Sequence, residues 1–269
     1  MKIQQKIALK VLTKNSPTVT KKIIKIKRKK WFSLRHTIFF LSLYSYDKII
    51  KNIFIMKLLK VSILLIACFM VTNVWAQDLQ TIKLNAPDKT RGSSTMKALS
   101  DRHSDREYDS KQLSMQDLSD LLWAANGVNR PDGKRTAPTA MNRQEIDVYI
   151  IREDGAYLYD AQAHSLQPIA KGDFRGAIAG SQDFAKTAPV CLLTVINLSK
   201  LGDPKAERTL LMGAVDAGIV TQNINIFCSA VGLSTVPRAS MEVDKLKSAL
   251  KLDETQIPIM NNPVGYPKK

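Results

Sequence analysis

The chain has 269 residues, of which 45% are hydrophobic and 24% charged, and a formal net charge of +16 at pH 7. The positive charge lies at the front, because residues 1–76 contain 16 Lys and Arg and one acidic residue, whereas residues 77–269 have a net charge of +1. Residues 77–269 therefore lack the basic surface typical of nucleic-acid-binding domains, and we expect no nucleic-acid partner.

Residues 56–76 have the pattern of a secretory signal peptide. A short basic stretch that begins at Met56 precedes an apolar run, and small residues lie before a cleavage position after Ala76. The apolar run is too short for a typical membrane span, so we expect an exported, periplasmic protein with no stable membrane insertion after cleavage. A lipobox-like sequence that ends at Cys68 leaves open a lipid-anchored form.

Residues 1–55 precede this signal, although a signal peptide works at an N-terminus. We expect translation to start at Met56 and residues 1–55 to be a misassigned leader. The alternative is a translated basic arm that contacts nucleic acid or anionic lipid. In either case residues 77–269 are long enough for one domain with a sizeable core.

The first polar cluster of this domain follows a helix expected from Ser94 toward Asp101. It reads Arg102-His103-Ser104-Asp105-Arg106, and two guanidiniums four positions apart can converge on one face of a helical turn. Such an arrangement suits a phosphate, because each planar guanidinium donates two parallel hydrogen bonds. In the alternative interpretation the cluster is a solvated surface turn, whose arginines pair with Asp101, Asp105, Glu107 and Asp109.

The second polar cluster follows an amphipathic helix over residues 114–125, whose start has a capping box formed by Ser114 and Asp117. This helix would carry the chain back toward the first cluster. The second cluster reads Pro138-Thr139-Ala140-x-Asn142-x-Gln144, a rigid turn with two amides. Amides donate and accept hydrogen bonds at once, which suits the edge of a heterocycle such as a flavin.

The remaining residues alternate between strand and helix patterns. Residues 146–151 and 156–160 predict a hairpin, followed by His164 in a loop or at a strand edge. Residues 190–196 predict a central strand buried on both faces, residues 206–231 a long helix that ends at Gly232, residues 241–251 another helix and residues 257–260 a last strand.

The mature chain offers little for a metal or thiol site. Cys191 and Cys228 lie in apolar runs, which predicts buried thiols and leaves a disulfide between them as an alternative. No C-x-x-C or H-E-x-x-H spacing occurs in the sequence, so we expect no bound metal.

The two polar clusters together resemble the nitroreductase-like family of FMN-dependent oxidoreductases. That family carries an R-x-S-x-R/K element for the flavin phosphate and, further along, a P-S-x-x-N-x-Q-like turn that meets the isoalloxazine ring. The sequence Leu-Leu-Trp-Ala-Ala-Asn-Gly at residues 121–127, with Arg-Thr-Ala-Pro at residues 135–138, resembles the thiazoline- or oxazoline-oxidase-type dehydrogenase branch. The resemblance covers residues 96–267 and includes the G-Y-P ending at Gly265.

The resemblance implies an α+β three-layer sandwich with an antiparallel-dominated central sheet flanked by helices. It also implies an intertwined homodimer with two FMN sites at the subunit boundary, where the turn at residues 138–144 reaches the ring from the other subunit. The implied cofactor-binding residues are Arg102, His103, Ser104, Arg106, Pro138, Thr139, Ala140, Asn142, Gln144, Pro237, Arg238, Ala239 and Lys268.

Within this set the resemblance assigns different tasks. Arg102, Ser104 and Arg106 would hold the phosphate, with help from Lys268 or Lys269, and residues 237–239 would lie near the reactive flavin nitrogen. Arg238 departs from the family pattern, which favours a small or acidic residue there. In the alternative interpretation Arg238 is an exposed loop arginine.

The implied activity is hydride transfer through flavin N5 to a small organic acceptor such as a nitro compound or quinone. NADH or NADPH, binding transiently, or another donor would supply the electrons, and no side chain needs to act as a catalytic acid or base. Two alternatives stay open: an exported flavin-binding or degenerate protein without turnover, and a structural interaction protein without a ligand.

Overall fold

A computed structural model describes residues 56–60 and 79–268. Residues 56–60 are helical, and residues 79–268 contain the sheet and the helices that pack on it. The predictions for residues 1–55, for the cleavage position after Ala76 and for Cys68 and Lys269 lie outside the described residues.

A seven-stranded sheet organises residues 79–268, and every strand pair in it is antiparallel. The strand order is β1-β4-β3-β2-β5-β7-β6, which places β5 near the middle. The strands are β1 Ile82–Lys83, β2 Ile146–Arg152, β3 Gly155–Asp160, β4 Ser165–Lys171, β5 Val190–Asn197, β6 Ser234–Thr235 and β7 Gln256–Gly265.

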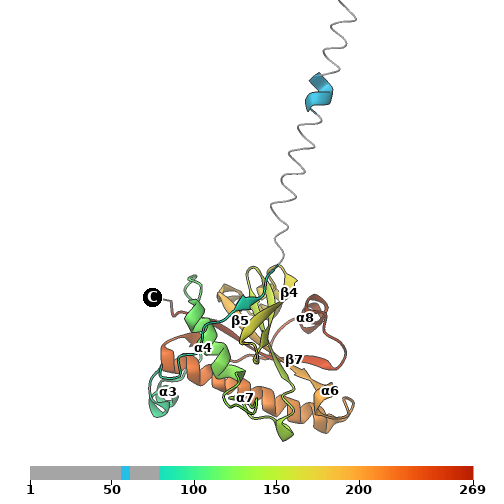
Figure 1. The fold of residues 1–269 in the computed structure, drawn as a ribbon. Coiled ribbons are helices and arrows are strands. Elements are labelled where there is room, and N and C mark those ends of the chain that lie inside the picture. Colours follow the sequence, from blue (N-terminus) through green and yellow to red (C-terminus); the bar gives the residue numbers. More distant parts are fainter. Residues whose placement is uncertain (1–55, 61–78, 269) are drawn as a thin grey trace, which may run out of the picture. The chain divides into compact units, whose positions relative to one another are not determined.

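Helices cover both faces of the sheet, so the fold is an α+β three-layer sandwich, as predicted. The core on one face is formed with α4, Met115–Asn126, and α7, Glu207–Val231. The core on the other face includes α5, Arg175–Ala179, and α8, Val243–Leu250. Figure 1 shows α7 running along the domain, with α3, Thr95–Asp101, near one of its ends and α6, Leu198–Leu201, near the other.

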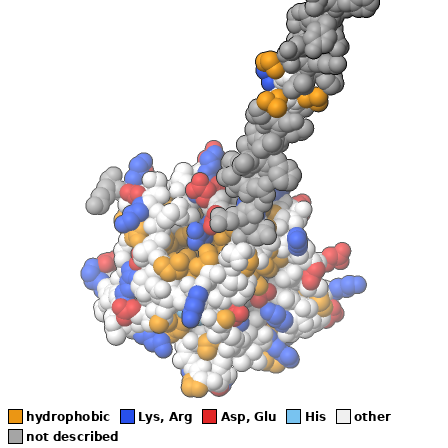
Figure 2. All heavy atoms as spheres, turned by 45° about the horizontal axis from the view of Figure 1, so that its top comes forward, with side chains coloured by type: hydrophobic (Ala, Val, Ile, Leu, Met, Phe, Trp, Pro, Cys, Tyr) orange, Lys and Arg blue, Asp and Glu red, His pale blue; other side chains and the backbone are white. Residues whose placement is uncertain are grey.

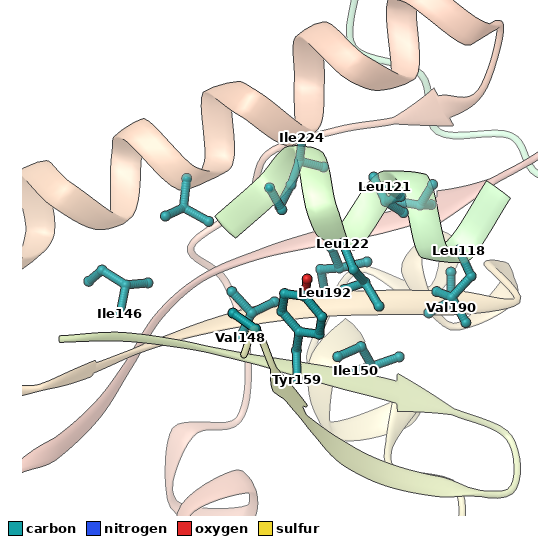
Figure 3. Close-up of a cluster of buried hydrophobic side chains, with 14 of the residues drawn as sticks. Leu118, Leu121, Leu122, Ile146, Val148, Ile150, Tyr159, Val190, Leu192 and Ile224 are labelled. Atoms are coloured by element: carbon teal, nitrogen blue, oxygen red, sulfur yellow. The ribbon is translucent and has the colours of Figure 1, made fainter. Parts of the chain in front are cut away.

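The central strand β5 explains how the layers are joined, because successive side chains of a strand point to opposite faces. Leu192 and Ile196 belong to the core beneath α4 and α7, whereas Leu193 and Val195 belong to the core beneath α5 and α8. Figure 3 shows Leu192 among side chains of α4, α7 and β2. The predicted burial of β5 on both faces is therefore confirmed.

Close packing sets the position of α7 over β5. A Cβ atom added at Gly213 would lie 2.5 Å from Cγ2 of Ile196, so only glycine fits there without a shift. By length and mean hydropathy, 1.2, α7 would also pass for a membrane-spanning helix. Its contacts with the sheet, α3 and α4 instead identify it as a core helix.

The ends of the predicted helices are confirmed by their caps. The hydroxyl of Ser94 accepts a hydrogen bond from the backbone of Lys97, and that of Ser114 accepts one from the backbone of Asp117 at 3.0 Å. Gly232 ends α7 in the left-handed conformation, with φ of 75°.

Several elements differ from the sequence-based expectation. β1, β4, α5 and α6 were not predicted, and β7 extends to Gly265 rather than ending at residue 260. Asn261 and Asn262, which are typical of a turn, are fully buried within β7 because their side chains have partners there. Cys191 and Cys228 are buried free thiols, so the alternative of a disulfide between them is wrong.

Surface charge agrees with the low net charge of residues 77–269. On the face that Figure 2 presents, Lys and Arg side chains are interspersed with Asp and Glu. The described residues of this face therefore form no continuous basic patch.

Candidate functional site

The first polar cluster begins where α3 ends. Arg102 is the C-cap residue of α3, and residues 103–107 are not helical, so the expected helical turn is wrong. The backbone N–H of Asp105 donates to the carbonyl of Thr235 at 3.0 Å, and the hydroxyl of Ser234 donates to the Asp105 carboxylate. The segment is therefore tied to β6 in an extended form.

The acidic residues near this cluster do not pair with its arginines, so the solvated-turn interpretation is wrong on this point. Asp101 accepts from Nζ of Lys97 at 2.6 Å, and Asp109 accepts from the backbone of Lys111 at 2.8 Å. Among the described residues, the side chains of three members have no hydrogen-bond or ion-pair partner: Arg102, Ser104 and Arg106.

These free donors fit the phosphate of FMN. Two guanidiniums and a hydroxyl, half-buried or exposed and unpaired within the described chain, can all donate to an anion. Arg106 is held by stacking, because its Cζ lies 5.9 Å from the centre of the Phe184 ring.

A cavity of about 270 Å³ lies beside the cluster. Its lining includes Asp101, His103, Asn225 and Ser229, with Pro267 at the C-terminal end of the chain. His103 lies in the cavity wall, with Nδ1 2.8 Å from the carbonyl oxygen of Asp101. Lys268 is exposed and directly follows Pro267, so its backbone is next to the cavity, where the resemblance places it.

The second cluster forms an irregular turn with an exposed outer face. Three of its residues adopt left-handed backbone conformations, with φ of 51° at Met141, 53° at Asn142 and 50° at Gln144. Such conformations are costly for residues other than glycine and require support from the surroundings. Gln144 supplies part of it, because its backbone N–H donates to Oγ1 of Thr139 at 2.8 Å and its side chain to the carbonyl of Gly133 at 3.0 Å.

Two buried carboxyl groups lie beneath this turn. Oδ2 of Asp216, on α7, accepts from the backbone N–H of Ala140 at 2.8 Å. Glu145 is fully buried, and neither of its carboxyl oxygens has a hydrogen-bond partner of good geometry among the described residues. Burial and the neighbouring Asp216 raise the pKa of Glu145 to about 7.

Within one chain, the two clusters lie far apart along α7, one near its middle and the other near its C-terminal end. The turn rests on Asp216, whereas Ser229 lines the cavity beside the first cluster. These residues are thirteen positions apart, which corresponds to about 20 Å along a helix. The expectation that α4 carries the second cluster back to the first is therefore wrong within a chain.

Arg238 is 6% exposed, so its interpretation as an exposed loop arginine is wrong. Its guanidinium donates to Oε1 of Gln182 at 2.9 Å and to Oδ1 of Asn261 at 2.9 Å. It also donates to the carbonyls that end α5, at 3.1 Å for Ile178 and 2.9 Å for Ala179. Burial lowers the pKa of Arg238.

Phe184 links Arg238 to the first cluster. The centre of its ring lies 5.4 Å from Cζ of Arg238 and 5.9 Å from Cζ of Arg106. The structure thereby brings residues 237–239 to the side of the phosphate cluster, with Pro237 half-buried and Ala239 exposed.

Sequence reasoning missed Glu145, Asp216 and Phe184. A usable signal existed for Asp216, because it is an acidic residue on the apolar face of a predicted core helix. Phe184 has no such signal, since its role depends on two arginines that are distant in sequence.

Comparisons with known proteins agree with one family. The model of the nitroreductase family matches residues 99–266, which include both polar clusters. A candidate nitroreductase of Methanocaldococcus jannaschii, MJ1384, is 30% identical over 61% of this chain and 86% of its own length. The FMN reductase (NAD(P)H) of Bacillus subtilis is 26% identical over 64% of this chain and 65% of its own length.

Solved structures extend the similarity to the fold. The crystal structure of a candidate nitroreductase from Ralstonia eutropha JMP134 matches with a TM-score of 0.68 at 34% identity. The match covers 72% of this chain and 92% of that chain.

Proposed function

Because the chain belongs to the nitroreductase family of flavin oxidoreductases, we propose that it is an FMN-dependent oxidoreductase acting on a small organic acceptor such as a nitro compound or a quinone. The observation that carries this proposal is the set of unpaired donors on Arg102, Ser104 and Arg106. Their sequence neighbours His103 and Asp105 line a cavity that the three donors themselves do not line, and no side chain of the described residues competes for the donors.

Each part of the site has a defined task in this proposal. Arg102, Ser104 and Arg106 bind the phosphate, and Lys268 adds a cation from the end of the chain. Pro138, Thr139, Ala140 and Asn142 contact the ring or the ribityl chain, and Gln144 supports their conformation through its two hydrogen bonds. Residues 237–239 lie near the reactive edge of the ring.

FMN, when bound, supplies hydride acceptance and donation at its N5 atom, with NADH, NADPH or another reductant as the donor. The chain positions the reactants and excludes water, and we assign no acid or base role to a side chain. The buried guanidinium of Arg238 adds a fixed positive charge behind the Phe184 ring.

The position of the turn supports an intertwined homodimer, in which the turn of one protomer reaches the cavity of its partner. Three apolar side chains near Asp216 are exposed on α7: Leu210 at 41%, Leu211 at 61% and Val215 at 52%. Met141, in the turn itself, is 76% exposed. Burial of these side chains by a second copy would stabilise the dimer and bring the two clusters together.

The signal-peptide pattern supports a location outside the cytoplasm, in the periplasm, and a lipid anchor at Cys68 is the lesser alternative. NADH and NADPH are scarce there, which favours another donor. The scarcity of these donors also supports one alternative function, that of an exported flavin-binding protein without turnover.

An absorbance spectrum of the purified chain tests the proposal. We expect the two bands of an oxidised flavin, and their loss when NADH, NADPH or dithionite is added under nitrogen. Bands that dithionite bleaches but neither nicotinamide does would point to another donor or to the alternative without turnover. A colourless protein that stays colourless after incubation with FMN would contradict the proposal.

A further inference from the structure

The turn at residues 138–144 depends on support from below. Met141, Asn142 and Gln144 hold left-handed conformations, each of which costs free energy that the surroundings must offset. Among the described residues, one hydrogen bond joins the turn to a helix. The Ala140 N–H donates to the carboxylate of Asp216, on α7, at 2.8 Å. The position of that carboxylate therefore sets the position of the turn.

Glu145 lies where it can act on this carboxylate. It directly follows the turn and begins the run into β2, and its backbone carbonyl accepts from Asn197 at 2.9 Å, which fixes its main chain. Its polar neighbours include the Asp216 carboxyl, which raises the pKa of Glu145, and the Thr139 hydroxyl, which lowers it. A buried carboxyl group with one neutral hydroxyl near it, beside a second carboxyl, is far more stable when the two carboxyl groups share a proton.

The charged groups that face Glu145 come from two directions. Asp216 faces it from α7, and Arg135 faces it from the segment before the turn. Nε of Arg135 is buried and has no hydrogen-bond acceptor among the described residues. A negative charge on Glu145 would thus be repelled by Asp216 and attracted by Arg135, so the arrangement of the two carboxyl groups depends on the charge of Glu145.

We propose that Glu145 and Asp216 form a carboxylic acid–carboxylate pair that positions the flavin-contacting turn, and that loss of the shared proton releases the turn. The proposal rests on the proposed function for the contact between turn and flavin. Glu145 is a positioning residue in it, because the side chain is fully buried and acts on the turn through Asp216. The proton that leaves Glu145 goes to solvent, and no other group changes its bonding or redox state.

The first arm of the test measures FMN affinity against pH. If only the protonated pair holds the turn, the dissociation constant should rise about twentyfold between pH 6.5 and pH 8.5. Glu145→Gln keeps the shape and supplies a permanent N–H donor to Asp216, so its affinity should stay flat. Asp216→Asn should likewise reduce the rise, because an amide can donate to the ionised Glu145. Glu254→Gln, at an exposed site, is the matched control and should follow the wild-type chain.

FMN itself titrates near pH 6 at its phosphate, but that effect is equal for the wild-type chain and for Glu145→Gln. A parallel rise in both would therefore overturn the proposal, as would a flat wild-type profile.

The second arm needs no flavin. Amide hydrogen exchange of residues 138–146 is measured in the chain without FMN and in Glu145→Gln at pH 6.5 and pH 8.5. Base catalysis speeds exchange in both proteins as the pH rises, so the readout is the ratio of their rates at each pH. Exchange in the wild-type chain should exceed that in Glu145→Gln by more at pH 8.5 than at pH 6.5. Equal exchange in the two proteins at both pH values would refute the pair. A chain that binds no FMN at any pH but shows the exchange difference would contradict the proposed function and leave the pair intact.

Discussion

Arg102 and Arg238 are both arginines of the predicted cofactor site, yet their surroundings differ. Arg102 is half-buried and has no acceptor among the described residues, so its donors are available to an anion. Arg238 is buried and donates to four neutral oxygens, two of them at the end of α5. The sequence could not separate these cases, because α5 is too short to leave a periodic pattern and its carbonyls are far from Arg238 along the chain.

The free guanidinium of Arg102 leads to a direct prediction. Arg102→Ala should raise the dissociation constant for FMN by roughly ten- to a hundredfold, which corresponds to the loss of a charge-assisted hydrogen bond of about 1.5–3 kcal/mol. The melting temperature without FMN should change little, because no hydrogen bond or ion pair of the described chain is lost. Titration calorimetry and thermal melts check this, with Arg130→Ala as an exposed control. Unchanged affinity would remove Arg102 from the phosphate site.

Glu145 predicts a pH dependence of stability. Its pKa is about 7 in the folded chain and 4.5 is its ordinary value, so between these values the folded state binds more protons than the unfolded state. The contribution of Glu145 to the free energy of unfolding is therefore greatest below pH 4.5. It falls by roughly 3 kcal/mol in total as the pH rises toward 7.

Urea unfolding of the chain without FMN at pH 5 and pH 8, for the wild-type chain and Glu145→Gln, measures this contribution. The difference between the two proteins isolates Glu145 from other titrating groups, such as His164, whose pKa is lowered by burial and which acts in the opposite direction. An equal pH effect in both proteins would mean that Glu145 ionises normally.

At the scale of elements, the sequence predicts those that have strong local signals. Caps at Ser94 and Ser114 and the left-handed Gly232 lie where the patterns put them, because they are satisfied within a few residues. β7 is longer than predicted because Asn261 and Asn262 are buried by partners distant in sequence, Arg238, Asn225 and Thr235. Local pattern cannot reveal such partners.

The packing of α7 on β5 predicts opposite effects at two glycines. Gly213→Ala should destabilise the fold by about 1–3 kcal/mol, because the new methyl group would press on Ile196. Gly218→Ala meets no atom within 4 Å and should stabilise it by up to about 1 kcal/mol through helix propensity. Denaturant unfolding of both variants provides the comparison. Equal effects would mean that α7 does not pack as closely as described.

At the scale of the whole molecule, the three-layer α+β architecture is implied by the family resemblance of the two clusters, whereas the assembly of the site within one chain is not. The two clusters can be identified from their residues alone, but their separation of about 20 Å along α7 depends on how the turn packs on Asp216. The two sequence motifs do not reveal whether the clusters meet within one chain or between two chains.

The exposed apolar face of α7 predicts the oligomeric state. Leu211→Glu would place a charge at the centre of the proposed dimer interface and should yield a monomer that loses FMN. Val243→Glu, on an exposed apolar site of α8, is the matched control and should stay dimeric. Light scattering after gel filtration measures both. A Leu211→Glu dimer with normal flavin content would exclude this face as the interface.

The separation of the turn and the phosphate cluster by about 20 Å along α7 has a genetic consequence. In the proposed dimer each site takes one half from each chain, so an Arg102→Ala chain and an Asn142→Ala chain fail separately but complement each other when co-expressed. Their hybrid has one intact site and one site with both defects, so half-occupied dimers with wild-type affinity should appear only in the mixture. Two defective alleles would then restore activity together, whereas a chain with a self-contained site gives no such rescue.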